Sequence, residues 1–136
     1  MTMQCNSVPC RFCPYRKDVP SGVWHEEEYQ KLLLYSNETM DQPTAVFACH
    51  NQPDDVCTGW LATGLRAEPR RAMLSLRLAM SMQTLTGFAE FEPEHDFFDT
   101  HTEAAEHGLR DIDDPSPEAQ DAMVVLGRMV ERRNNE

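Results

Sequence analysis

Apolar residues recur with helical spacing in three long stretches of the chain. Residues 25–35 (HEEEYQKLLLY) place their apolar side chains on one face, and three glutamates occupy the first turn, where the helix dipole favours negative charge. Residues 69–86 begin at a proline and are apolar over most of the helix circumference. Residues 117–133 follow Ser116, a good capping residue, and keep apolar positions at i, i+4, i+7 and i+11. We expect three main helices whose apolar faces pack together.

Shorter elements are predicted between these helices. Residues 44–49 (TAVFAC) are β-branched and aromatic between turn-forming segments, which predicts a strand. Residues 88–98 mix aromatic and acidic side chains and are expected to form a short edge strand. Residues 57–65 have the composition of two helical turns, and residues 100–108 begin with a capping box that predicts a short helix. Residues 1–22, punctuated by prolines, are expected to be irregular.

The size of the chain favours a single domain over residues 1–136. Its 136 residues are 40% hydrophobic, enough for a modest core. We expect an α+β, helix-dominated fold with one or two short strands, in which a cysteine-containing, metal-stabilised section (1–65) precedes a helical section (66–133). Because no run approaches the roughly 20 apolar residues of a membrane span and no secretory signal is recognised, a cytoplasmic protein without membrane contact is expected.

The chain is strongly acidic. Acidic residues outnumber basic ones 23 to 12, which gives a formal charge of −11. Such a surface repels nucleic-acid phosphates, so nucleic-acid binding is disfavoured. The charge is compatible with a basic protein partner, although solubility alone explains it equally well.

All five cysteines lie within the first 57 residues. An odd number without a secretory signal argues against a disulfide framework and favours metal ligands or redox groups, with buried cysteines that bind no metal as the alternative. Cys10 and Cys13 form a C-x2-C knuckle, in which backbone amides can donate to sulfur. Cys49 ends the predicted strand and Cys57 begins a helix. These two pairs are predicted to close a tetrahedral site for Zn²⁺, and an iron–sulfur cluster is the alternative, because both accept four thiolates and the spacing does not separate them.

Two further side chains are possible alternates as ligands, His50 and Cys5. His50 follows Cys49 directly, and adjacent residues of an extended strand point to opposite faces, so a supporting or surface position is expected for it. Cys5 lies near the N-terminus and is expected to be spare. Several neighbours could offset the thiolate charge or shield the ion, or could serve only as surface charges and packing groups: Arg11, Arg16, Lys17, Trp24 and Trp60.

The sequence favours a non-catalytic protein. It has no Gly-rich phosphate loop, serine elbow or paired-carboxylate signature. Cys10-x-x-Cys13 lacks the preceding strand and following helix of a thioredoxin-like motif. An enzyme that uses Cys49 and His50, or the C-x2-C thiols, is the alternative.

Several segments together resemble a family of uncharacterised Cys-containing proteins from actinobacteria and their phages, a domain of unknown function. The segments are CRFCPYRKDVPSGVWHEEEY, FACH, CTGW and, more loosely, TEAAEHGLRDIDDPSPEA. The resemblance covers residues 10–65 and 98–120. It includes the same four cysteines with His50 beside them and leaves Cys5 outside. It implies an intracellular setting, in the host cytoplasm if the gene belongs to a phage, and an accessory role, but no activity.

These observations lead to one main expectation about function. The protein is expected to be a small intracellular accessory protein with a structural four-cysteine metal site that acts by binding another macromolecule, most simply a protein. One alternative is an iron–sulfur redox or sensor protein. Another is an acidic decoy that covers a basic surface of a host protein.

Overall fold

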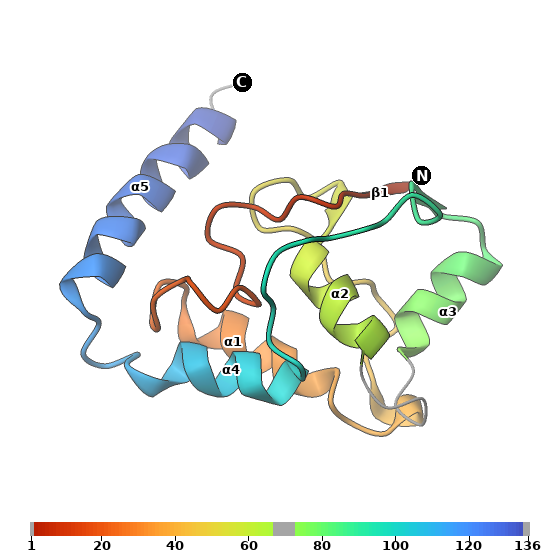
Figure 1. The fold of residues 1–136 in the computed structure, drawn as a ribbon, viewed down its shortest axis with the longest axis horizontal. Coiled ribbons are helices and arrows are strands. Elements are labelled where there is room, and N and C mark those ends of the chain that lie inside the picture. Colours follow the sequence, from red (N-terminus) through yellow and green to blue (C-terminus); the bar gives the residue numbers. More distant parts are fainter. Residues whose placement is uncertain (1, 67–72, 135–136) are drawn as a thin grey trace.

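The computed structural model describes residues 2–66 and 73–134 (Figure 1). The described chain is α+β and helix-rich, as the sequence predicts, with five α-helices and a small three-stranded sheet. None of the described helices is long and apolar enough to cross a membrane. The elements in chain order are β1 (Met3–Cys5), α1 (Glu26–Leu34), the 3-10 helix η1 (Thr39–Asp41), β2 (Asp55–Val56), α2 (Thr58–Arg66), α3 (Leu74–Ser81), β3 (Leu85–Thr86), α4 (His101–Arg110) and α5 (Pro117–Asn134).

The sheet forms where the sequence patterns did not predict strands. Its order is β2-β1-β3 with both pairs parallel, so the N-terminal strand lies in the centre. The expectation that residues 1–22 are irregular throughout is therefore wrong at β1. The expected strands over 44–49 and 88–98 are also not observed, since each contributes a single isolated bridge. Their apolar residues pack into the core from irregular backbone instead.

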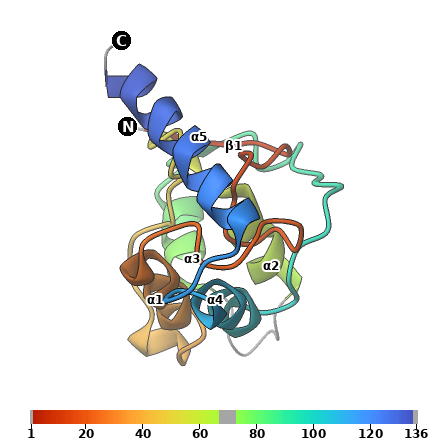
Figure 2. The same ribbon diagram turned by 90° about the vertical axis from the view of Figure 1, so that its left-hand side faces the viewer.

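Helix α1 packs along α4, and Figures 1 and 2 both show the two helices side by side. Tyr29 and Leu32 of α1 are buried, as are Ala104, Ala105 and Gly108 of α4, and the Tyr29 ring lies against Gly108. The expectation that the helices over 25–35, 69–86 and 117–133 pack together is therefore wrong. Instead, α1 packs on α4, the helix predicted from the capping box, because Gly108 leaves room for the Tyr29 ring.

Helix α3 is shorter than the predicted helix over 69–86. It spans Leu74–Ser81, and residues 69–72 lie outside the described part of the chain. The chain leaves the helix through Gln83, which has a left-handed φ of 57°. This early ending frees Leu85 and Thr86 to pair with β1 as the strand β3.

The last two helices begin at the side-chain caps that the sequence predicts. The backbone N–H of Glu103 donates to the hydroxyl of Thr100 (3.0 Å), and that of Ala119 donates to Ser116 (3.1 Å). Beyond its cap, α5 extends away from the body of the molecule (Figures 1 and 2). The start of α5 forms a second, small core cluster with the loop that contains the C-x2-C motif. From α5 the cluster contains Ala119, Ala122 and Leu126, and from the loop Phe12, Val19 and Val23. The loop around the C-x2-C motif therefore supports α5.

The main core contains a buried tyrosine–histidine pair. The Tyr15 hydroxyl and His101 Nδ1 lie 2.8 Å apart, and both residues are almost completely inaccessible to solvent. Burial lowers the pKa of His101 to about 4. A histidine with this environment stays neutral in the folded protein and is protonated far more readily after unfolding.

We expect the stability to fall in acid because of His101. The unfolded chain binds a proton at this histidine near pH 6.5, whereas the folded chain does so only near pH 4. The free energy of unfolding should therefore decrease by about 3 kcal/mol as the pH falls from about 6.5 to about 4. Urea denaturation across this range measures the slope. His101→Leu should remove this part of it, and substitution of the exposed His95 by glutamine should leave it intact. Equal slopes for wild type and His101→Leu would contradict the assignment.

Candidate metal centre

The C-x2-C motif forms a tight turn with backbone amides directed at both sulfurs. The N–H of Cys13 donates to the carbonyl oxygen of Cys10 (3.2 Å) and closes the turn. The backbone amide of Phe12 donates to the Cys10 sulfur, and that of Tyr15 donates to the Cys13 sulfur. Each donor lies two residues after its cysteine. Amides in these positions stabilise negative charge on sulfur, as expected for a knuckle that binds a metal ion through thiolates.

The other two cysteines lie on the two sides of a short hairpin-like structure, in which residues 47–49 pair with residues 55–57. We call this structure the clamp. The N–H of Cys49 donates to the carbonyl of Asp55 (2.8 Å), and the N–H of Cys57 donates to the carbonyl of Phe47 (2.8 Å). These bonds flank an isolated antiparallel bridge. Because side chains alternate along extended backbone, Cys49 shares a face with Phe47, and the opposed Cys57 lies on that same face. The seven residues between Cys49 and Cys57, a spacing that fits no standard knuckle, therefore form the turn and the returning segment of this clamp.

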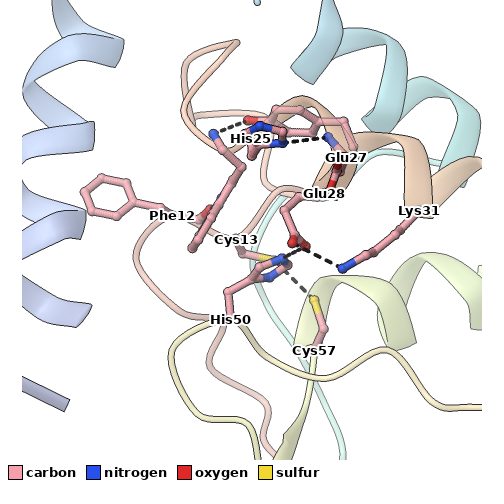
Figure 3. Close-up of polar contacts among 10 residues, drawn as sticks. Phe12, Cys13, His25, Glu27, Glu28, Lys31, His50 and Cys57 are labelled. Atoms are coloured by element: carbon pink, nitrogen blue, oxygen red, sulfur yellow. Dashed lines mark hydrogen bonds and ion pairs between the residues drawn. The ribbon is translucent and has the colours of Figure 1, made fainter. Parts of the chain in front are cut away.

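The structure brings the four predicted cysteines together as a chain of thiol contacts. The Cys13 and Cys57 sulfurs lie 3.8 Å apart (Figure 3). The Cys10 thiol contacts those of both Cys13 and Cys49. The contacts thus run from Cys49 through Cys10 and Cys13 to Cys57. The chain of contacts is open: among the residues that the structure describes, no group of three or more His, Cys, Asp or Glu side chains is arranged to hold a metal ion as it stands.

The four thiols divide into an inner and an outer pair. Cys13 and Cys57 are 1% and 2% exposed, whereas Cys10 and Cys49 are partly accessible. The neighbouring Cys13 thiol raises the pKa of Cys10 to about 12. Contact with Cys10, together with burial, raises the pKa of Cys49 strongly. Crowded thiols of this kind ionise only when a cation compensates their charge.

Arg16 places a positive charge beside the knuckle. Its guanidinium donates to the carbonyls of Cys10 (3.3 Å) and Arg11 (3.1 Å) while it is paired with Asp18 (2.6 Å). The other two cations considered for this role have different partners. Arg11 lies over the ring of Phe12 at 5.1 Å, and the Lys17 ammonium lies 3.5 Å from a carboxylate oxygen of Asp96.

The two alternate ligands have structural positions of their own. His50 Nε2 lies 2.6 Å from the Glu28 carboxylate (Figure 3). The His50 ring packs on Trp24 with ring centroids 4.3 Å apart. Although partial burial opposes it, the hydrogen bond from His50 helps to hold the pKa of Glu28 below its usual value. Cys5 is buried within β1, where it pairs in register with Val56. From the sequence, Glu28 is expected only to stabilise the start of the helix. Its contact with His50 is not predicted.

A glycine of α2 and the indole of Trp24 lie close to the knuckle. Gly59 of α2 leaves room for the knuckle, since a Cβ there would lie 2.7 Å from the Cys13 sulfur and 2.3 Å from Cβ of Tyr15. The indole N–H of Trp24 donates to the Phe12 carbonyl (2.7 Å) and braces the turn from outside. Trp60 is fully buried and packs on Tyr35 with ring centroids 5.4 Å apart.

The fold and the site together define a small, helix-rich α+β protein with four clustered thiols. The chain belongs to a protein family of unknown function, DUF6283, which matches residues 5–132. This membership confirms the expectation of an uncharacterised domain family. No curated protein and no solved structure is significantly similar to the chain.

Proposed function

We propose that this protein is a small metal-binding protein in which Cys10, Cys13, Cys49 and Cys57 hold one Zn²⁺ ion, and that it acts by binding another macromolecule. The ion would join the N-terminal knuckle to the clamp between Cys49 and Cys57. A site with four protein ligands has no open position for substrate, so its role would be structural.

The distance between the Cys13 and Cys57 sulfurs carries this proposal. Two sulfurs that each lie about 2.3 Å from a tetrahedral zinc ion are separated by about 3.8 Å. The inner pair has this separation, 3.8 Å, and it is shielded from solvent. The amides that donate to sulfur from Phe12 and Tyr15 provide the outer hydrogen bonds that thiolate ligands require. The donor set therefore fits zinc.

An iron–sulfur cluster is the competing occupant. In a four-iron cluster each thiolate binds a different iron atom, so the sulfurs stand farther apart than around one ion. The short separation within the inner pair favours a single ion over a four-iron cluster, and metal analysis separates it from a two-iron cluster, in which two thiolates share one iron. A colourless protein with one zinc ion would exclude the cluster, whereas a brown anaerobic preparation with visible absorbance would replace zinc with iron.

Removal of the metal tests the proposal directly. The purified protein should contain one zinc ion, and a strong chelator should lower its free energy of unfolding by about 3 kcal/mol, since a site formed only in the folded chain couples ion binding to folding. Elemental analysis and thermal unfolding with and without chelator measure both effects. A preparation without zinc or iron whose melting temperature ignores the chelator would refute the site.

Matched variants separate ligands from other cysteines. Cys13→Ser should lose the ion, because Cys13 contacts two of the other three thiols. Cys5→Ser, although Cys5 is also buried, should retain one zinc ion, because Cys5 is not among the four thiols that contact one another. Loss of zinc from Cys5→Ser alone would reassign the ligand set.

The mode of action is proposed from charge and setting. With a formal charge of −11, the protein is suited to a basic protein partner, and covering a basic host surface as an acidic decoy is the variant form of this idea. An accessory role in the cytoplasm of an actinobacterium, or of one infected by a phage, belongs to the same proposal. Binding to an isolated host partner that weakens with added salt would support it, and binding that is independent of salt would count against the decoy.

A further inference from the structure

The partly exposed thiols of the cluster form a modification site that a purely structural metal centre does not need. We propose that Cys10 and Cys49 are the first point of attack by a peroxide, and that oxidation converts the four thiols into two disulfides, Cys10–Cys49 and Cys13–Cys57, with release of the ion. The release of the ion rests on the proposed function. The disulfide pairing rests on the thiol contacts alone.

The contacts select one pairing out of three. Four cysteines allow three sets of two disulfides. Pairing Cys10 with Cys49 and Cys13 with Cys57 uses an observed thiol contact in both bonds. A Cys10–Cys13 bond would leave Cys49 and Cys57, the two ends of the chain of contacts, to pair with each other. Pairing Cys10 with Cys57 and Cys13 with Cys49 would use none of the three contacts between the thiols.

Burial sets the order of oxidation. Cys10 and Cys49 are partly accessible, whereas the inner thiols are almost completely covered. Gly59 backs the Cys13 sulfur at close range, and Trp24 braces the turn. Since reactivity toward oxidants follows exposure as well as thiolate character, the outer pair should react first.

The chemistry balances with peroxide as the oxidant. One outer sulfur attacks the peroxide O–O bond, becomes a sulfenic acid and releases one water. The second outer thiol then displaces the hydroxyl group as a second water and forms the S–S bond, so that two sulfurs give up two electrons to one peroxide. The ion thereby loses two of its four ligands. A second peroxide oxidises the inner pair in the same way.

The oxidised form should keep its fold. Each proposed disulfide joins the knuckle to the clamp, which are the same two segments that the ion would join. A covalent link between these distant segments limits the unfolded chain as the ion does. Oxidation would therefore exchange one cross-link for another, and a dithiol reductant with zinc should restore the starting state.

Stepwise oxidation with peptide mapping tests this proposal. Reduced, zinc-loaded protein is treated with one and then two equivalents of hydrogen peroxide, remaining thiols are alkylated, and released zinc is read with a chromogenic chelator. Trypsin cuts after Arg11 and so separates Cys10 from Cys13, and a protease that cuts before Asp54 or Asp55 separates Cys49 from Cys57. After one equivalent, Cys10–Cys49 should exceed Cys13–Cys57 by about tenfold. After two, both should be present and zinc should be free.

The outcomes are distinct from those for the metal site. Cys5→Ser should give the same two disulfides. A Cys10–Cys13 bond, a disulfide to Cys5, or sulfinic acids without disulfides would overturn the proposal. Protein that contains no metal but forms both disulfides would refute the proposed function and leave the pairing intact. Protein that binds zinc but does not form the two disulfides would refute the pairing and leave the proposed function intact.

Discussion

Gly59→Ala is expected to lower the free energy of unfolding by about 4 kcal/mol and to abolish metal binding. The new methyl group would lie 2.3 Å from Cβ of Tyr15 and 2.7 Å from the Cys13 sulfur. Tyr15 is completely buried and cannot move aside without disturbing its contact with His101. The knuckle must therefore shift, and the cost lies at the upper end of that observed for overpacked cores. Chemical denaturation and zinc analysis of the purified variant measure the two effects.

A matched glycine provides the control. Gly127 of α5 has no atom within 4 Å of an added Cβ. Because alanine is the better helix former, Gly127→Ala should raise the stability by about 0.5–1 kcal/mol and leave zinc bound. Opposite signs at two helical glycines would show that contact with the knuckle, and not helix propensity, governs position 59. A stable, zinc-loaded Gly59→Ala would disprove the close approach of α2 to the knuckle.

Gly108→Ala should destabilise the fold by a similar amount, about 4 kcal/mol, through a different contact. An added Cβ would lie 2.1 Å from two ring carbons of Tyr29, where α1 and α4 meet. Tyr29 is 1% exposed, and its hydroxyl accepts a hydrogen bond from the N–H of Trp24 (3.0 Å), so the ring cannot rotate away freely. Thermal and urea unfolding measure the loss.

The metal content distinguishes the two variants. Below its melting temperature Gly108→Ala should still bind one zinc ion, because the atoms nearest the added Cβ all belong to Tyr29 and none to a cysteine. Replacing the Tyr29 ring by the smaller leucine side chain in a Gly108→Ala, Tyr29→Leu double variant should recover part of the lost stability. If Gly108→Ala acted only within α4, the second substitution would recover nothing. A Gly108→Ala variant as stable as the wild type would show that the two helices are not in the close contact described.

The sequence predicts well those features whose cause lies within a few residues. The starts of α4 and α5 are set by Thr100 and Ser116, whose hydroxyls accept from amides three residues later. The amides that donate to sulfur in the C-x2-C turn are likewise a local property of that turn. The four cysteines that the sequence grouped are in mutual contact through a chain of thiols, although their role as ligands stays a prediction.

The wrong expectations share another cause. An apolar run such as residues 44–49 is compatible with a strand or with buried irregular backbone, and only its neighbours decide. The central strand β1 has just three residues, which are too few for a hydrophobic pattern to predict a strand. Likewise, α1 packs on α4 rather than on α3 or α5 because Gly108 of α4 leaves room for the Tyr29 ring.

By itself the sequence determined the starts of α4 and α5, the acidity and the kind of donor atoms gathered near the N-terminus, because each depends on residue type or on neighbours within one turn. Tertiary structure alone decided that Cys49 and Cys57 share one face of a clamp, that the thiols divide into inner and outer pairs, and that His50 lies against Glu28. It also decided the burial of His101. These features depend on contacts between residues far apart in the chain, whose free energy is gained only when the whole core packs together.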